Sequence, residues 1–163
     1  AINWTLSYSE YMDDLAPWYG KNVDATFLEK RQELLSILHE ESRLMEIVKL
    51  IGSDVLPDDQ KLILETARLI RTGFLQQNAY HKDDTYVPLD KQMKMMELIL
   101  LLHHKALALV SPEKGGAVPV SAILETGLFN KLVRMKYDIP NDHLELFDQY
   151  KQEIEDKLGA LHA

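Results

Sequence analysis

The sequence predicts an all-α fold, a bundle of about six or seven helices with no sheet. Apolar residues recur at helical spacing nearly throughout the chain. Only 7 glycines occur among 163 residues, and most of them fall between the periodic segments. A chain of this length buries roughly 70% of its extended surface, and 46% hydrophobic residues can supply the core. We therefore expect residues 1–163 to form one helical domain.

The first predicted helix covers residues 9–18. Asp24 is a suitable N-cap for a second helix that runs to about His39. Another helical stretch, residues 41–51, continues or follows the second helix, and Gly52 ends it.

Pro57 has the features of a helical first turn, because it lacks an N–H group that would be unpaired there. Asp58 and Asp59 follow it and oppose the positive end of the helix dipole. The helix that starts there is expected to pack inward along one stripe. The stripe consists of Ile63, Ala67, Ile70 and Phe74.

Pro88 opens the helix that we expect to be central and most buried, because its apolar residues fill more than half of the helical wheel. These residues are Met93, Met96, Ile99, Leu100, Leu102, His103, Leu107 and Val110. Residues 111–119, with two prolines and two adjacent glycines, predict a flexible loop. A segment at residues 120–136, broken near Gly127, and a last helix after Pro140 complete the bundle.

Charge and composition exclude several classes of function. The net charge of −8 repels a phosphate backbone, so nucleic acid is not an expected partner. The absence of cysteine excludes disulfides and thiolate metal sites. The longest uncharged apolar run, residues 98–102, is far shorter than the roughly 20 residues that cross a bilayer. Membrane association is therefore expected only through partners. A start at Ala1 without a targeting pattern suggests a piece of a longer protein.

The sequence predicts no catalytic and no metal-binding residue. It has no glycine loop that ends in Gly-Lys-Ser/Thr to cradle phosphate, so this chain alone is not expected to hydrolyse a nucleotide. No two histidines have the four-residue spacing typical of zinc sites. His103 lies in the apolar arc, where a hydrogen-bonded core histidine is a better interpretation than an acid or base.

Two segments could serve as contact surfaces. Residues 52–59 carry three acids, no base and the apolar pair Val55 and Leu56. They predict either a capped turn with this pair folded under it, or a protruding tip that meets a basic or mobile partner. Aromatic residues concentrate in the first twenty positions, either as core or as a surface for another domain. That surface supports a rival hypothesis, a stand-alone helical protein-interaction adaptor; a metal-dependent helical enzyme is a more distant one.

The most specific motif lies at residues 74–80, which read Phe-Leu-Gln-Gln-Asn-Ala-Tyr, and at residues 84–89, which read Asp-Thr-Tyr-Val-Pro-Leu. It resembles the C-terminal helical domain of the catalytic A subunits of archaeal A-type and vacuolar-type rotary ATPases. The similarity extends over most of the chain, including Leu-Glu-Thr-Ala-Arg-Leu-Ile-Arg at residues 64–71. Tyr80 stands where the family usually has phenylalanine, and Val87 where it often has cysteine.

The resemblance implies a helical bundle that follows a nucleotide-binding domain absent from this chain. The parent would be an ion-transporting ATP synthase or hydrolase that moves protons or sodium ions. Three A subunits would alternate with three B subunits, as an A3B3 hexamer around a central stalk, on the cytoplasmic face of the membrane. ATP or ADP with Mg would bind the parent protein, whereas the isolated fragment is expected to be inactive and to bind no cofactor.

The resemblance also implies site residues. Residues 52–59 match the position of a lever loop that touches the rotor, and its working residues would be Asp54, Val55, Leu56, Asp58 and Asp59. Ala79 and Tyr80 match the alanine and the aromatic ring that the family places against adenine, and Phe74 would support them.

Overall fold

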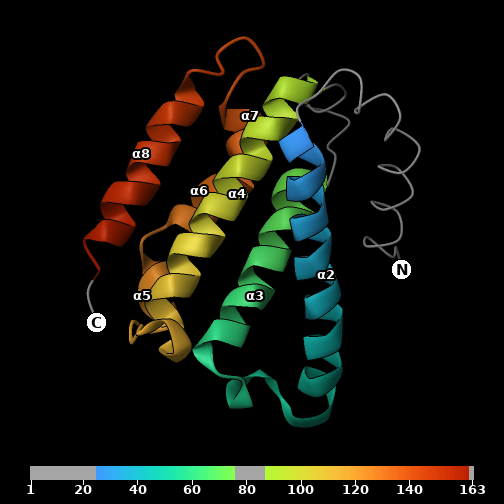
Figure 1. Ribbon diagram of the computed structural model, residues 1–163, viewed down its shortest axis with the longest axis vertical. Helices are drawn as coiled ribbons and strands as arrows, with labels where there is room; N and C mark the ends of the chain where they lie inside the picture. Colours follow the sequence, from blue (N-terminus) through green and yellow to red (C-terminus); the bar gives the residue numbers. More distant parts are fainter. Residues whose placement is uncertain (1–24, 76–86, 162–163) are drawn as a thin grey trace.

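The structure is a computed structural model that describes residues 25–75 and 87–161 (Figure 1). This part of the chain contains seven α-helices and no strand, which confirms the all-α prediction. The elements are α2 (Ala25–Ile51), η1 (Ser53–Val55), α3 (Asp58–Leu69), the π-helix η2 (Ile70–Leu75), α4 (Leu89–Val110), η3 (Pro112–Lys114), α5 (Val120–Glu125), α6 (Leu128–Val133), α7 (Met135–Asp138) and α8 (Leu146–Gly159). The helix expected at residues 9–18 and the N-cap expected at Asp24 lie outside the described residues.

Helix α2 joins the two stretches predicted before Gly52 into one helix of 27 residues. Neither glycine nor proline interrupts it. It ends before Gly52, whose φ angle of 89° glycine adopts at little energetic cost. Of the two alternatives left open for residues 41–51, the structure therefore shows continuation of the second helix.

Helix α3 packs against α2 and α4. Pro57 occupies its N-cap, one position before the predicted first turn. The predicted inward stripe is partly wrong, because Ile63 and Phe74 are only half-buried. The fully buried positions are Leu62, Thr66, Ala67, Leu69, Ile70 and Gly73. Helix α3 also contacts α5 and α6, so its buried face is wider than the predicted stripe, and Ile63 and Phe74 pack against the core as partly buried residues.

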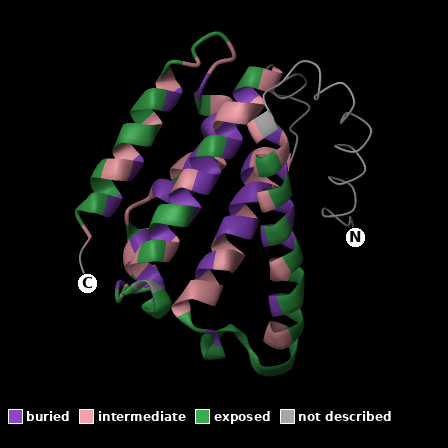
Figure 2. Cartoon of the chain, in the orientation of Figure 1, coloured by how far each residue is buried: buried purple, intermediate pink, exposed green. Residues whose placement is uncertain are grey.

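Helix α4 is central, as predicted, because it contacts α2, α3, α6 and α8. Segments coloured as buried recur along its length in Figure 2. Three details differ from the prediction: Met95 is buried in place of Met93, Ala106 in place of Leu107, and Leu98 is buried in addition. The sequence did not predict that Lys91 joins the buried set.

Residues 111–119, expected as a flexible loop, form a turn with its own backbone hydrogen bonds. Gly116 N–H donates to Ser111 O at 2.9 Å, and Val118 N–H donates to Leu109 O at 3.0 Å. A Cβ on Gly116 would lie only 2.2 Å from Leu109 O. The absence of a side chain at Gly116 therefore lets the turn pass close to the end of α4.

The C-terminal part packs short helices and α8 against the centre. The break predicted near Gly127 is present, with φ of 77°, and a second break occurs at Arg134. Helix α8 contacts α4 and buries Phe147, Ile154 and Leu158. In Figure 1, α8 runs along the side of α4 opposite to α2.

Candidate functional site

Helices α2 and α3 are joined at one end of the bundle by a short turn, residues 52–57, which with the neighbouring residues 50–51 and 58–59 we call the tip. Gly52 N–H donates to Val48 O at 2.8 Å, and Leu56 N–H donates to Ser53 O at 3.1 Å. These bonds close the end of α2 and the one-turn helix η1. The tip is therefore a compact turn at the far end of two packed helices (Figure 1).

The tip exposes apolar side chains. Leu50, Ile51 and Val55 are 84%, 62% and 57% exposed. With Met45 they are the only exposed large hydrophobic residues in the described part of the chain, and all four lie at this end of α2 or in η1. Isolated exposed apolar residues need no explanation, but a group of them is typical of a contact surface.

The residues predicted to touch a rotor divide into two groups. Asp54 and Val55 are exposed on η1. Leu56 is only 6% exposed, so its side chain supports the tip from below. Of the pair expected under a capped turn, Leu56 is therefore folded under and Val55 is exposed.

Asp58 and Asp59 act within the chain. Asp58 Oδ2 accepts a hydrogen bond from Val120 N–H at 2.9 Å, at the start of α5. Asp59 Oδ1 accepts one from Gln60 N–H at 3.0 Å. Asp58 therefore ties the base of the tip to the C-terminal helices.

The residues predicted to meet adenine are only partly described. Phe74 is half-buried and packs against the hydrophobic core from η2. Ala79 and Tyr80 lie outside the described residues, as do the aromatic residues of the first twenty positions.

The π-helix η2 carries the chain toward residue 76. A Cβ added to Gly73 would lie 3.0 Å from Val133 Cα and 3.2 Å from Leu132 O, so η2 passes very close to α6. One-turn π-helices within α-helices are frequent at functional sites. Gly73 is thus required by packing and not by its φ angle.

Lys91 is a site residue that the sequence reasoning missed. Its side chain is 0% exposed, and its Nζ donates to Lys136 O at 2.8 Å, Ile139 O at 2.7 Å and Asn141 Oδ1 at 2.8 Å. A buried ammonium needs such acceptors, and the carbonyls at the end of α7 supply them. The signal in the sequence was the position of Lys91 in the apolar register of Met95, Leu98 and Leu102.

His103 is the hydrogen-bonded core histidine that the sequence predicted. It is buried, and its Nδ1 lies 2.7 Å from Thr66 Oγ1. The pair joins α4 to α3 across the core. This partner gives the ring a structural role.

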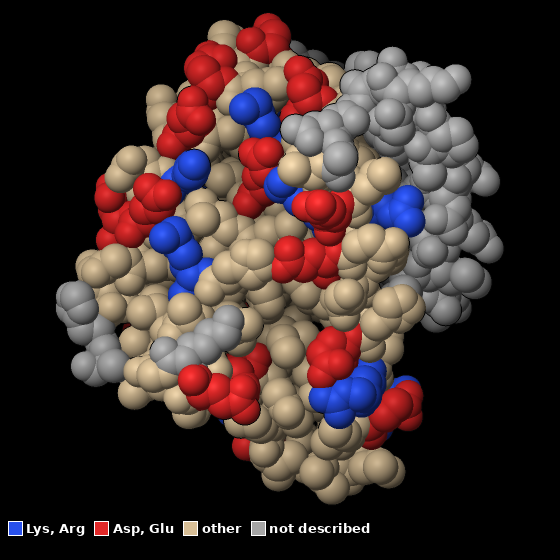
Figure 3. Space-filling view, viewed as in Figure 1, with Lys and Arg blue, Asp and Glu red and all other residues tan. Residues whose placement is uncertain are grey.

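On the face shown in Figure 3, acidic side chains gather over α8 with a few basic side chains between them. The Lys131 ammonium that hydrogen-bonds to Glu153 holds the pKa of that carboxyl below its usual value, with Lys157 adding to the effect against partial burial. In the turn before α8, the Glu145 carboxylate accepts a hydrogen bond from His143 at 3.0 Å and, with Asp142, raises the pKa of that histidine. The Glu153 and Glu145 carboxylates therefore stabilise contacts with Lys131 and His143 within the domain.

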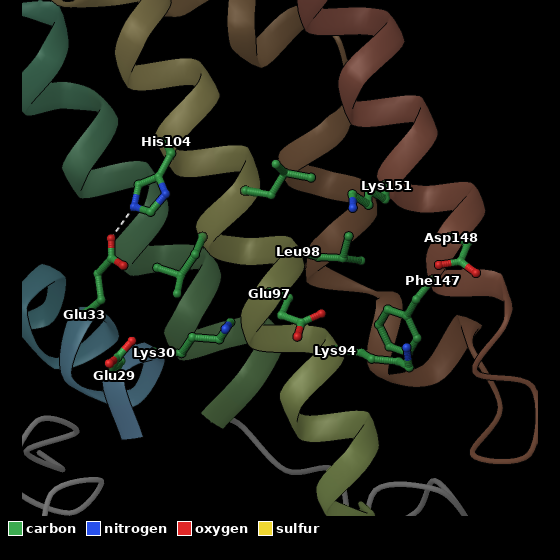
Figure 4. Close-up of a pocket in the computed structure, with 12 residues that line it drawn as sticks. Glu29, Lys30, Glu33, Lys94, Glu97, Leu98, His104, Phe147, Asp148 and Lys151 are labelled. Carbon is green, nitrogen blue, oxygen red and sulfur yellow. Dashed lines mark hydrogen bonds and ion pairs between the residues drawn. The ribbon is translucent and has the colours of Figure 1, made fainter. Parts of the chain in front are cut away.

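A groove of about 440 Å³ lies between α2, α4 and α8 (Figure 4). Buried Leu98 and Phe147 line it, and its rim carries lysines and carboxylates, among them Lys30 and Glu97. The only interaction drawn between its lining residues joins His104 to Glu33. None of the predicted site residues lines it, and its mixed charge selects for no class of ligand.

The described residues hold no group of three or more His, Asp or Glu side chains placed for a metal ion. Among them, no helix is long and apolar enough to cross a membrane.

Comparison with known proteins gives consistent matches. Residues 16–116 match the model of a family described as the C-terminal domain of V and A type ATP synthase. The chain is 50% identical over 144 residues to V-type ATP synthase alpha chain 2 of Clostridium tetani, covering 88% of this chain and 24% of that protein. It is 44% identical over 161 residues to the V-type ATP synthase alpha chain of Halothermothrix orenii, covering 99% and 27%. It is 43% identical over 162 residues to the A subunit of the A-type ATP synthase of Methanopyrus kandleri, covering 99% and 26%.

The chain thus spans about a quarter of the length of the curated relatives it matches. These relatives carry both the V-type and the A-type name and include bacterial proteins, so the match does not restrict the chain to an archaeal source.

Proposed function

The chain belongs to the family of C-terminal domains of V and A type ATP synthases, and on that premise we propose that it couples nucleotide chemistry to rotation in such an enzyme. It would form the C-terminal part of the catalytic subunit of an ion-translocating rotary ATP synthase or ATPase. The family match carries this proposal, together with relatives named as the alpha chain or the A subunit. The parent would transport protons or sodium ions.

In the proposed mechanism, this helical domain moves as a lever whose tip pushes the central stalk. Two features support a lever. Helix α2, with 27 residues, is about 40 Å long and packs along α3. The tip exposes Asp54 and Val55, beside Leu50 and Ile51, at the far end of this pair. A stiff element with an exposed end transmits force where a flexible one would bend.

Leu56, Asp58 and Asp59 belong to the same proposed contact in a supporting role. Leu56 is buried beneath η1, and Asp58 bonds to the start of α5. They would hold the tip in shape while Asp54 and the apolar residues meet the stalk. A contact that combines carboxylates with apolar surface suits a partner with basic and apolar side chains.

We also propose that Ala79 and Tyr80 form an edge of the adenine pocket, with Phe74 as support. Stacking on an aromatic ring contributes about 1 kcal/mol. The described residues do not fit a Mg²⁺ ion, since no three suitable side chains converge. ATP or ADP with Mg would therefore be held chiefly by other parts of the parent protein.

The partners in this proposal are B subunits, arranged with A subunits as an A3B3 hexamer, and the central stalk. The domain would lie on the cytoplasmic face of the membrane without entering it, and nucleic acid would not be a partner. The isolated chain would bind ATP weakly or not at all and would hydrolyse none; turnover by the purified chain would contradict this.

Replacement of residues 52–59 by a neutral flexible linker tests the lever. In a reconstituted complex that hydrolyses ATP, single-molecule torque should be lost while nucleotide binding is retained. The matched control neutralises Asp142 and Glu145, two exposed acids, and should leave torque unchanged. They belong to the turn between α7 and α8, which lies at the end of the bundle opposite to the turn between α2 and α3 (Figure 1). Full torque with the linker in place would refute the lever role of the tip.

A further inference from the structure

The base of the tip is bonded to a helix that begins 62 positions later in the chain. Asp58 is the first residue of α3, and its Oδ2 accepts a hydrogen bond from Val120 N–H at 2.9 Å. Val120 is the first residue of α5, where the N-cap residue Pro119 supplies no side-chain cap. The first N–H groups of a helix have no partner within that helix. Asp58 therefore supplies, from α3, an acceptor that α5 lacks locally.

Packing between α3 and α5 supports this bond. The two helices are in contact, and α5 also contacts α6. Ile123 of α5 and Leu62 of α3 are both 0% exposed and belong to the same hydrophobic core. The bond from Val120 to Asp58 is itself partly buried. A hydrogen bond that is partly removed from water is stronger than an exposed one.

The turn of residues 111–119 joins the start of α5 to the end of α4. Gly116 N–H donates to Ser111 O at 2.9 Å, and Val118 N–H donates to Leu109 O at 3.0 Å. Ser111 and Val118 are each only 4% exposed. Segments with bonded backbone and buried side chains open less readily than solvated loops. The turn is therefore a firm connection between the two helices.

Gly116 allows this turn to lie directly on the end of α4. A Cβ at this position would be 2.2 Å from Leu109 O and 2.6 Å from Ala108 O. Both are backbone atoms of α4, so they cannot rotate away as the end of a side chain can. Packed protein atoms leave no free space for such an overlap. Any side chain at position 116 would lift the turn away from α4.

Residues 111–120, which we call the strut, thus connect the central helix with the tip. The turn within the strut lies at the same end of the bundle as the tip (Figure 1). One end of the strut is bonded to α4, and the other is bonded to Asp58. Helix α4 in turn contacts α2, α3, α6 and α8. A load on the tip therefore has two routes into the bundle, along the α2 and α3 pair and through the strut to α4.

We infer that the strut transmits force from the tip to α4, with Asp58 and Gly116 as its positioning residues. This inference rests on the proposed lever function of the domain. Within the strut, Asp58 acts through an acceptor oxygen and not through its charge, and it need not touch the stalk. Contiguous packed and hydrogen-bonded elements carry coupling between distant parts of a protein. The strut is such an element between the tip and the central helix.

The first test measures amide hydrogen exchange in the 163-residue chain. Asp58→Ala removes the acceptor of Val120 N–H, so exchange at Val120 should accelerate about fivefold, as expected for the loss of one hydrogen bond. Asp58→Asn keeps an acceptor oxygen and should change the rate by less than about twofold. The matched control is Asp90→Ala, which removes another first-turn acid whose Oδ1 accepts from Lys91 N–H, and it should leave exchange at Val120 unchanged. Unchanged exchange in Asp58→Ala would overturn the inference.

The second test measures single-molecule torque in the assembled parent complex. Asp58→Ala and Gly116→Ala should each lower the torque about twofold, a change typical of substitutions along a contiguous network. Nucleotide binding should be retained. Asp58→Asn should keep full torque, because the strut needs the acceptor and not the charge. If Asp58→Asn loses as much torque as Asp58→Ala, the residue acts through its charge, and the inference is overturned.

The double variant Asp58→Ala with Gly116→Ala tests whether the two residues belong to one route. Residues of one network have non-additive effects, whereas independent sites add. The double variant should therefore lose no more torque than the more affected single variant. Additive losses would place Asp58 and Gly116 on separate routes and would refute the strut.

Two controls separate force transmission from loss of stability. Gly159→Ala adds a Cβ in α8 where nothing lies within 4 Å. Leu158→Ala removes a side chain that is only 3% exposed and destabilises the core through α8, away from the strut. Both variants should keep full torque. A loss of torque in Leu158→Ala as large as in Asp58→Ala would overturn the inference, since general instability would then explain both.

Comparison with the linker variant distinguishes this inference from the proposed function. If the linker in place of residues 52–59 leaves torque unchanged, the lever proposal fails, and force transmission through the strut fails with it. If the linker abolishes torque while Asp58→Ala and Gly116→Ala keep it, the lever proposal stands and the strut alone is refuted.

Discussion

Lys91 near the start of α4 is 0% exposed, whereas Leu50 at the end of α2 is 84% exposed. The start of α4 and the end of α2 lie at opposite ends of the bundle (Figure 1). Lysine is normally among the most exposed residue types and leucine among the most buried. Each end therefore departs from the usual burial of its residue type: a lysine is buried at one end, and a leucine is exposed at the other.

The unusual residues at the two ends have different roles. Around Lys91, three acceptors satisfy the buried ammonium, so polarity is used to fasten α4 to α7. At the tip, Leu50 and Ile51 have no such role within the described chain, and their surface remains available for contact. One end is organised by internal bonds, and the other presents a surface.

The largest effect is expected from Lys91→Met in the 163-residue chain. The free energy of unfolding should fall by about 3 kcal/mol, because the carbonyls of Lys136 and Ile139 lose their buried donor. Denaturant unfolding measures it, with Lys105→Met as control, expected within about 0.5 kcal/mol of the original. Equal stability of the two variants would mean that Lys91 does not fasten α4.

A smaller loss of stability is expected from Thr66→Val, a substitution in the core between α3 and α4. His103 Nδ1 would lose the hydroxyl at 2.7 Å, and stability should fall by about 1–2 kcal/mol. Thr72→Val is the control, since the Thr72 hydroxyl donates locally to Arg68 O, four residues earlier in the chain. Thermal unfolding should rank the two variants in that order, and the reverse order would contradict the structural role of His103.

The tip should tolerate change. Leu50→Ser combined with Ile51→Ser should alter stability by no more than about 0.5 kcal/mol, because both side chains are exposed. Chemical denaturation of the isolated chain checks this. A loss of several kcal/mol would show that these residues support the fold, which would remove the contrast between the two ends.

The smallest effect concerns His143, an exposed residue in the turn that also contains Asn141. Hydrogen bonding to Glu145 raises the pKa of His143, so its stabilisation is complete below the unfolded pKa of about 6.5 and is lost as pH rises through the folded pKa. An NMR titration should give a higher pKa in the original chain than in Glu145→Gln. Equal pKa values in the two proteins would show that the hydrogen bond from His143 to Glu145 contributes nothing to stability, in contrast to the bonds of the buried Lys91.

Particular residues show how far prediction from sequence reached. Gly52, Pro57 and Gly127 punctuate the helices close to where the sequence indicated, because caps and positive φ angles are local properties. The tip was recognised from its acids, and its exposed Leu50 and Ile51 were missed because they belong to the periodic pattern of α2. The roles of Ala79, Tyr80 and the tip in a larger enzyme remain predictions.

The sequence by itself determined the helical class, the order of the main helices and, through its motifs, the family. Only the tertiary structure decided which face of each helix is buried, that residues 111–119 form a bonded turn, and that Lys91 and Gly73 meet residues 132–141. Helix formation depends on neighbours three or four positions apart, which a sequence displays directly. Burial and bonding across the core depend on residues tens of positions apart, such as Lys91 and Asn141, and only folding brings them together.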